Sequence, residues 1–113
     1  MPYKIGLKEE RRKRLEEELN RMLPLIIKSG VKKVILFGSL AKGVVHKGSD
    51  IDLVIVKDTK KRFLDRLDEY YSLLSPKVAT DIFVYTPEEF EEIMKEGGFL
   101  HSALKEGKVL YEE

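Results

Sequence analysis

Hydrophobic residues keep a helical spacing over the first quarter of this chain. Between residues 8 and 29, apolar side chains recur every three or four positions, at Leu15, Leu19, Met22, Ile26 and Ile27. This pattern predicts one long helix that buries a single face. Because Pro24 lies inside the segment, we expect a kink or a restarted helix there.

Three later segments have the composition of strands. Residues 31–37 are rich in β-branched and aromatic side chains, and residues 79–85 are similar. Residues 50–56 end in the continuous apolar run Leu53-Val54-Ile55-Val56, which predicts a strand covered on both faces. Residues 109–111 are predicted to add an edge strand.

Three further helices are predicted around these strands. Asp58 or Thr59 can cap the first of them. Its expected buried stripe is Phe63, Leu64, Leu67, Tyr70, Tyr71 and Leu74. The segment Thr86-Pro87-Glu88-Glu89 predicts a helix start with a capping box, and Gly97-Gly98 ends that helix. Residues 99–105 complete the set, and the order α-β-β-α-β-α-α-β predicts an α/β (α+β) fold.

Composition narrows the class of protein. The chain has 113 residues, which fits one domain over 1–113, and no cysteine, which excludes disulfides and Cys-based zinc sites. A net charge of +1 produces no overall positive electrostatic potential that would attract nucleic acid. There is no bilayer-spanning apolar run and no signal-peptide pattern, so we expect a cytoplasmic protein with no membrane contact. The basic run Arg11–Arg14 could bind RNA, but Glu16–Glu18 offset it and favour a solvated helix face.

Two short motifs carry candidate chemistry. Gly38-Ser39-Leu40-Ala41-Lys42-Gly43 is a small-residue turn after a strand, and Asp50 and Asp52 begin the next strand. Side chains at i and i+2 of a strand share a face, so these two acids are expected to point the same way. Asp81 opens a later strand. Three convergent carboxylates beside a phosphate-sized turn predict metal-dependent phosphoryl or nucleotidyl transfer.

Each motif alone has a structural explanation. The Gly-Ser pair could be an ordinary turn, Asp50 a cap, Asp52 a solvated strand residue, and Asp81 a residue that protects a strand edge. Two acids on one face of an apolar strand, however, repel each other unless a cation lies between them. The combination therefore favours a metal site.

In this order and spacing, the motifs resemble those of the nucleotidyltransferase superfamily with the polymerase-β-like fold. The chain is most similar to its minimal members, single small domains typically encoded beside a helical HEPN-domain protein in pairs that look like toxin–antitoxin systems. The resemblance implies a small mixed β-sheet flanked by helices. It also implies that Asp50, Asp52 and Asp81 hold two Mg²⁺ ions, or Mn²⁺, and are catalytic.

The resemblance also assigns the nucleotide-binding residues. Gly38 and Ser39 match the Gly-Ser that approaches the phosphates of ATP. Many relatives carry Arg where this chain has Leu40 and Lys42. Lys42 keeps a positive charge without the bidentate fork, and it is expected either to contact phosphate or to lie in solvent.

Three functions follow from the resemblance. The first is transfer of AMP from ATP to a hydroxyl of a HEPN-domain partner, for which the complete set of acids argues. The second is a nucleotide-binding antitoxin module that neutralises its partner by contact alone, for which Leu40 and Lys42 argue mildly. The third is a subunit of an antibiotic nucleotidyltransferase, which would need an acceptor site made by a homo- or hetero-oligomer.

Overall fold

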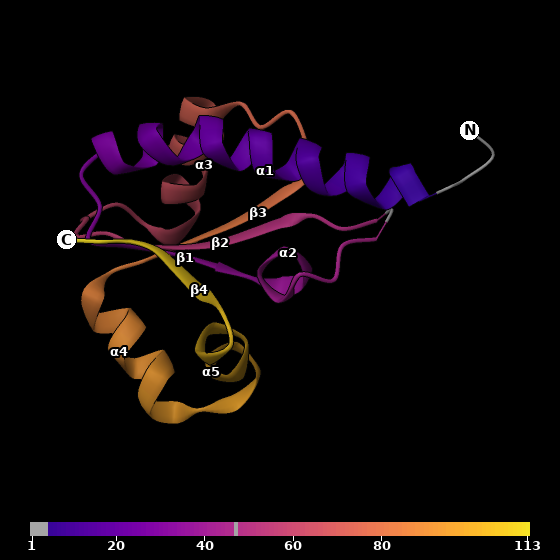
Figure 1. The fold of residues 1–113 in the computed structure, drawn as a ribbon. Coiled ribbons are helices and arrows are strands. Elements are labelled where there is room, and N and C mark those ends of the chain that lie inside the picture. The colour runs from indigo at the N-terminus through magenta and orange to yellow at the C-terminus, as the bar shows by residue number, and fades with distance from the viewer. Residues whose placement is uncertain (1–4, 47) are drawn as a thin grey trace.

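A mixed β-sheet lies at the centre of the computed structural model, which describes residues 5–46 and 48–113 (Figure 1). The described strands form a four-stranded sheet in the order β3-β2-β1-β4. Strand β1 (Lys33–Phe37) runs antiparallel to β2 (Ile51–Val56) and to β4 (Lys108–Glu112), whereas β2 runs parallel to β3 (Thr80–Tyr85). The predicted α/β fold with a mixed sheet is confirmed, and β4 is an edge strand as expected.

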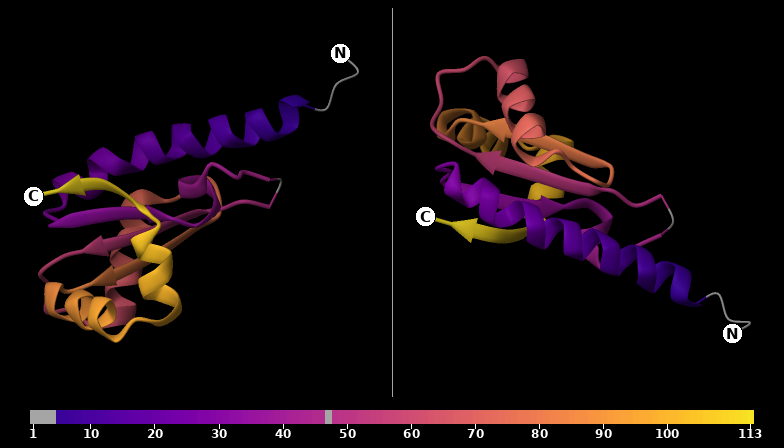
Figure 2. Two further views of the ribbon diagram at one scale, coloured as in Figure 1. Left: turned by 60° about the horizontal axis from the view of Figure 1, so that its bottom comes forward. Right: turned by 90° about the horizontal axis from the view of Figure 1, so that it is seen from above.

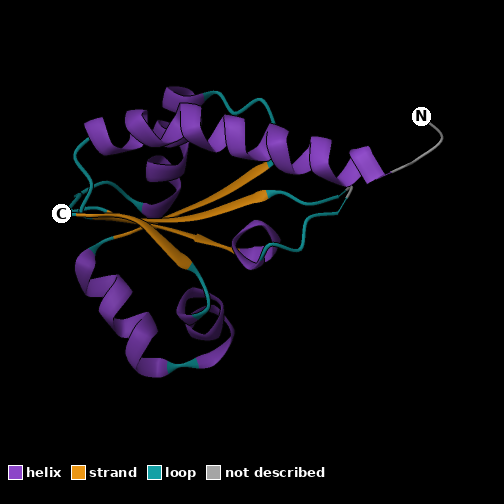
Figure 3. Ribbon diagram, in the orientation of Figure 1, coloured by secondary structure: helices purple, strands orange, loops and turns teal. Residues whose placement is uncertain are grey.

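Helices cover both faces of this sheet. Helices α1 (Ile5–Lys28) and α3 (Phe63–Leu74) lie on one face, and α4 (Pro87–Glu96) and α5 (Gly98–Lys105) lie on the other (Figure 1, Figure 3). The short helix α2 (Gly38–Lys42) follows β1 directly. The sequence pattern did not predict it, because its five residues are too few for a periodic signal.

The larger hydrophobic core lies between the sheet and α1 with α3. Alternate residues of β2 enter it, as do residues 34 and 36 of β1 and residues 82 and 84 of β3. The apolar stripe of α1 closes this core with Leu15, Leu19, Met22 and Ile26, all buried as predicted. Ile27 is only partly buried.

The second core, beneath α4 and α5, is smaller. Ile35, Val54, Val56 and Leu104 are its buried members. Among the described residues of α4 none is fully buried, so this helix rests on the sheet through partly buried side chains. Burial of Leu53 toward one core and of Val54 toward the other confirms that β2 is covered on both faces.

Helix α3 differs from its prediction at its start and along its face. It begins at Phe63 after Arg62, and no side chain caps it, whereas Thr59 accepts a hydrogen bond from the Lys61 amide in the preceding turn. The predicted stripe is correct for Tyr70 and Leu74, which are buried, and for Leu67, which is partly buried. It is wrong at the following three positions, which are exposed: Phe63, Leu64 and Tyr71.

Arg66 explains the shifted face of α3. This side chain is buried, its Nε donates to the Lys61 carbonyl, and its Nη1 donates to the Val84 carbonyl and pairs with Glu89 Oε1 at 2.6 Å. An arginine with these partners occupies the face that a hydrophobic pattern assigns to apolar residues. Glu89 also belongs to the predicted capping box with Thr86, which is confirmed.

Helix α1 continues through Pro24 without a break, so the expected restart does not occur. Its N-terminal half runs beside the loop between α2 and β2 (Figure 2). There Arg11 donates to the Ser49 carbonyl at 2.6 Å, and Arg12 donates to the Gly43 carbonyl at 2.7 Å. The interpretation of this basic run as a solvated face is therefore wrong for these two residues and correct for Lys13 and Arg14, which are exposed.

Glu18 ties α1 to the end of α3. Its buried carboxylate pairs with Arg21 through two hydrogen bonds of 2.7 and 2.9 Å and accepts a third from the Lys77 amide. Arg21 also donates to the Leu74 carbonyl. The hydrogen bonds from Arg21 outweigh the effect of burial and lower the pKa of Glu18 to about 2.

We expect Glu18→Gln to lower the free energy of unfolding by about 2 kcal/mol at pH 7, because it removes a buried charge-assisted pair. The unfolded chain protonates this group near pH 4.3, so the contribution is complete above that pH and is lost as the pH falls toward 2. Urea denaturation at pH 7 and pH 2.5 measures both effects. Glu17→Gln, at an exposed neighbouring position, is the control, and equal midpoints for the two variants at pH 7 would contradict the assignment.

Candidate active site

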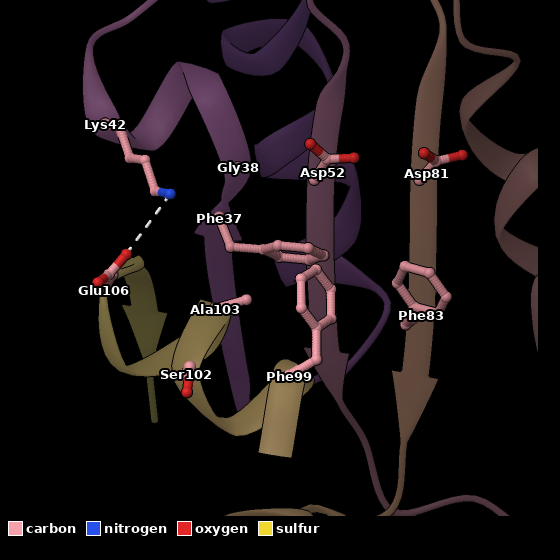
Figure 4. Close-up of a pocket in the computed structure, with 10 residues that line it drawn as sticks. All are labelled: Phe37, Gly38, Lys42, Asp52, Asp81, Phe83, Phe99, Ser102, Ala103 and Glu106. Atoms are coloured by element: carbon pink, nitrogen blue, oxygen red, sulfur yellow. Dashed lines mark ion pairs between the residues drawn. The ribbon is translucent and has the colours of Figure 1, made fainter. Parts of the chain in front are cut away.

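Two acidic side chains face each other across neighbouring strands. In the parallel pairing of β2 with β3, Asp52 lies opposite Asp81, and in the antiparallel pairing of β1 with β2, Phe37 lies opposite Asp52. All three side chains lie on the sheet face that α5 covers, and the two carboxylates stand side by side (Figure 4). The sequence prediction that Asp52 and Asp81 converge is thus met by the sheet register.

Gly38 gives Asp52 its place beside α2. The backbone of Gly38 has φ +78, a conformation that residues with a side chain rarely adopt. A Cβ on Gly38 would overlap Asp52 Oδ2 and lie 3.2 Å from its Cγ. Absence of a side chain therefore serves two purposes here, since it permits the turn into α2 and leaves room for the carboxylate.

The electrostatics of the acid pair disfavour two negative charges. Burial, the charge of Asp81, a hydrogen bond shared with Asp81 and the charge of Asp50 together raise the pKa of Asp52 to about 6. Burial is the largest of these causes. A carboxyl group whose pKa is shifted by burial and by neighbouring charges is a candidate functional residue.

The acids open into a cavity of about 460 Å³ between the sheet and α5 (Figure 4). Gly38 and Lys42 line it from α2, and Asp52 and Asp81 from the sheet. Its remaining lining residues are Phe37, Phe83, Phe99, Ser102, Ala103 and Glu106. A cavity of this size suits a ligand as large as a nucleoside.

Asp50 and Ser39 lie outside this lining. Asp50 directly precedes β2, which begins at Ile51. Within residues 5–46 and 48–113, no three carboxylate or histidine side chains are grouped so that they could hold a metal ion. The expected convergence of three acids is therefore seen for two of them, with Asp50 acting on Asp52 through its charge.

The candidate phosphate-binding residues have different surroundings. Ser39 is partly buried in α2, and its carbonyl accepts from the Val44 amide at 3.0 Å. Lys42 lies at the cavity edge, where its Nζ is 3.5 Å from Glu106 Oε2 and both side chains are more than half exposed. Leu40 is buried in the larger core, so this position supplies no group to the cavity.

The loop that carries Asp50 is held by α1. The buried Ser49 accepts a hydrogen bond from the His46 amide through its Oγ, and its carbonyl accepts from Arg11. Arg12 holds the other end of this loop at Gly43. The two arginine contacts could not be found from sequence, because they join residues 38 and 31 positions apart.

The aromatic residues of the cavity had a partial signal in the sequence. Phe83 follows Asp81 by two positions in one strand, so it shares its face. Phe37 directly precedes the Gly-Ser turn. Phe99 had no such signal, since a phenylalanine in a short amphipathic helix is normally assigned to the core.

None of the helices in the described part of the chain has the length and apolar character needed to cross a membrane.

Comparison with known proteins defines the class. The family model of the nucleotidyltransferase domain matches residues 12–112, so the chain belongs to that family. The expected resemblance to polymerase-β-like minimal nucleotidyltransferases is confirmed, and the protein is a nucleotidyltransferase.

Relatives and solved structures agree with this class. The chain is 37% identical over 81 residues to the candidate protein adenylyltransferase MJ0604 of Methanocaldococcus jannaschii, covering 72% of this chain and 79% of that protein. A crystal structure of a candidate nucleotidyltransferase from Sulfolobus solfataricus matches with a TM-score of 0.70 at 18% identity, over 100% of this chain and 94% of that one. A toxin–antitoxin crystal structure with AMP-PNP matches with a TM-score of 0.52 at 19% identity, over 83% and 73%. These two structures support the fold.

The Gly38 contact predicts a difference between two glycine variants. Gly43 has φ +77 and nothing within 4 Å of an added Cβ, so it is a matched control for Gly38. We expect Gly38→Ala and Gly43→Ala each to cost about 1 kcal/mol of backbone strain. Only Gly38→Ala should displace the Asp52 carboxylate. NMR titration of the carboxyl groups would record that displacement as a changed pKa of Asp52. An identical titration in both variants would refute the contact.

The raised pKa of Asp52 predicts how stability depends on pH. The folded state holds this proton up to about pH 6, whereas the unfolded chain releases it near pH 3.9, so stability falls as the pH rises between these values. In chelator at pH 8, Asp52→Asn should therefore melt roughly 4 °C higher than the parent, about 1 kcal/mol after solvent screening is allowed for. At pH 4 the two should melt alike.

The control for this measurement is Asp58→Asn, which changes an exposed acid after β2. A parent protein that melts above the Asp52→Asn variant at pH 8 would assign Asp52 a structural role instead.

Proposed function

We propose that this protein transfers AMP from ATP to a hydroxyl group of a partner protein of the HEPN type, and thereby acts as an antitoxin. The observation that carries the proposal is the facing pair Asp52 and Asp81 beside the side-chain-free turn at Gly38, at the mouth of one cavity. The names of the M. jannaschii relative and of the toxin–antitoxin structure agree with it.

The acid pair suits the divalent metal that the family typically uses. Carboxylate oxygens are the ligands that Mg²⁺ prefers, and Asp52 and Asp81 face each other across β2 and β3. Asp52 and Asp81 would hold the metal, and Asp50, two residues before Asp52, would complete the set of ligands for two Mg²⁺ or Mn²⁺ ions. When bound, Mg²⁺ would neutralise charge on the triphosphate and make the acceptor hydroxyl easier to deprotonate.

The reaction joins the acceptor oxygen to the α-phosphorus of ATP. The bond between the α-phosphorus and the bridging oxygen to the β-phosphate breaks, and pyrophosphate leaves with that oxygen. The acceptor hydroxyl loses its proton, and Asp81 is the candidate base, because its side chain is exposed.

The residues of the turn bind the phosphates in this proposal. Gly38 lets the backbone approach them, and the Ser39 hydroxyl is a candidate donor to their oxygens. Lys42 would exchange its exposed pairing with Glu106 for a phosphate, since such surface pairs contribute little stability. Residues 1–113 would act as one domain, and the cytoplasm would supply ATP and the partner.

A non-catalytic antitoxin is the second candidate. Two observations favour it: Asp50 does not join the acid pair, and Leu40 is buried where many relatives are expected to carry arginine. Such a module would neutralise its partner by contact and need no transfer.

The test uses a HEPN-domain protein that is encoded beside this one. It is incubated with this protein and Mg-ATP, and its intact mass is then measured by mass spectrometry. We expect a mass increase of one AMP and release of pyrophosphate. Asp81→Asn should slow the transfer at least about hundredfold while weakening ATP binding less, because it acts at the acceptor oxygen. Asp58→Asn is the matched acidic control and should transfer at the rate of the parent.

The result that would exclude the enzyme is specific. It is the absence of an adduct together with full neutralisation of the partner by the variant that carries both Asp52→Asn and Asp81→Asn. That result would establish the antitoxin that acts by contact.

A further inference from the structure

Phe99 is an apolar ring left in solvent at the mouth of the cavity. It is 88% exposed, more than any other large hydrophobic side chain among residues 9–46 and 48–113. Its neighbours in α5 behave differently, since Leu100 packs against the smaller core and Leu104 is buried in it. A ring that no protein group covers, in a helix whose other apolar residues are covered, has a free face for a ligand.

The turn before α5 presents this ring. Gly97 and Gly98 both have positive φ, +76 and +91, so the chain reverses between α4 and α5 within two residues. Phe99 then falls in the first turn of α5 and lines the cavity that also contains Asp52 and Asp81. In Figure 4 its ring points from α5 toward that of Phe37.

Two more aromatic rings, those of Phe37 and Phe83, line the cavity beside Phe99. Phe37 and Phe83 are partly buried, and their ring centroids are 6.2 Å apart at an interplanar angle of 41°. Both follow from the strand register, because Phe37 lies opposite Asp52 and Phe83 lies two residues after Asp81. Aromatic surface therefore begins directly beside the acid pair and extends to Phe99.

Polar groups are few in this part of the cavity. Ser102 supplies one hydroxyl, and Lys42 and Glu106 neutralise each other at the edge. A ligand between the rings would meet aromatic faces and almost no fixed hydrogen-bond partners for its edge.

We propose that Phe37, Phe83 and Phe99 form a stacking wall for the nucleobase of the bound nucleotide, an inference that rests on the proposed function. A triphosphate held at Gly38 and the acids leaves its ribose and base to enter the adjoining cavity. The volume of about 460 Å³ suits a nucleoside better than one side chain of a partner protein.

This wall has a consequence for the choice of nucleotide. Stacking recognises the face of a base and tolerates different edges. The wall therefore binds ATP and GTP with similar affinity, and it binds both more tightly than CTP or UTP, whose single rings cover less of it.

Calorimetry with two probes separates the wall from the phosphate site. Mg-AMP-PNP contains the base, and Mg-tripolyphosphate lacks it. Phe99→Ala should weaken AMP-PNP binding about tenfold, the loss of one stacked ring, and leave tripolyphosphate binding within twofold of the parent. Phe99→Tyr keeps the ring and should restore AMP-PNP binding. Val109→Ala, at an exposed position in β4 outside the cavity lining, is the control and should change neither.

Each contrary outcome has a distinct meaning. AMP-PNP binding within twofold of the parent in Phe99→Ala overturns the wall and leaves the proposed function standing, and so does an equal loss for both probes. If Phe99→Ala binds AMP-PNP like the parent but transfers AMP to the partner more slowly, the Phe99 ring contacts the acceptor protein instead of the base. Failure of the parent to bind either probe overturns the proposed function, and the wall with it.

Discussion

The register of β3 against β2 is the constraint on which the site depends. It sets Asp52 opposite Asp81, a pairing that electrostatic repulsion opposes. The same register turns Ile82 and Val84 into the larger core, where both are buried. A slip by one residue would turn these side chains out of the larger core and onto the opposite face of the sheet, so burial on one face of β3 holds two like charges together on the other. The fold thus supplies the energy that keeps Asp52 and Asp81 side by side.

Other parts of the site are positioned relative to this pair. Gly38 is compatible with the Asp52 carboxylate because it has no side chain, and the turn there starts α2 beside the acids. Arg11 and Arg12 reach from α1 to the loop that leads to Asp50. Strand pairing, a glycine and a distant helix therefore each contribute one element of the proposed nucleotide site, and none of them would identify that site alone.

Sequence reasoning succeeded where the signal was local or periodic. The spacing of α1, the capping box at Thr86 and the strand pattern around Asp52 follow from neighbouring residues, and the motif spacing indicated the family. It failed where a distant partner decides the outcome. Arg66 is buried because carbonyls and a carboxylate from other elements surround it. Exposure of Phe99 depends on how α5 packs, which composition does not encode.

The two hydrophobic cores divide the site between regions of unequal stability. The acids lie on strands that the larger core stabilises, whereas the opposite wall of the cavity belongs to α5, above the smaller core. Partial unfolding begins where the fewest apolar groups are buried. Amide hydrogens of α4 and α5 will therefore exchange with solvent well before those of β2. Local unfolding of α4 and α5 would widen one side of the cavity, while the strands that carry Asp52 and Asp81 stay folded.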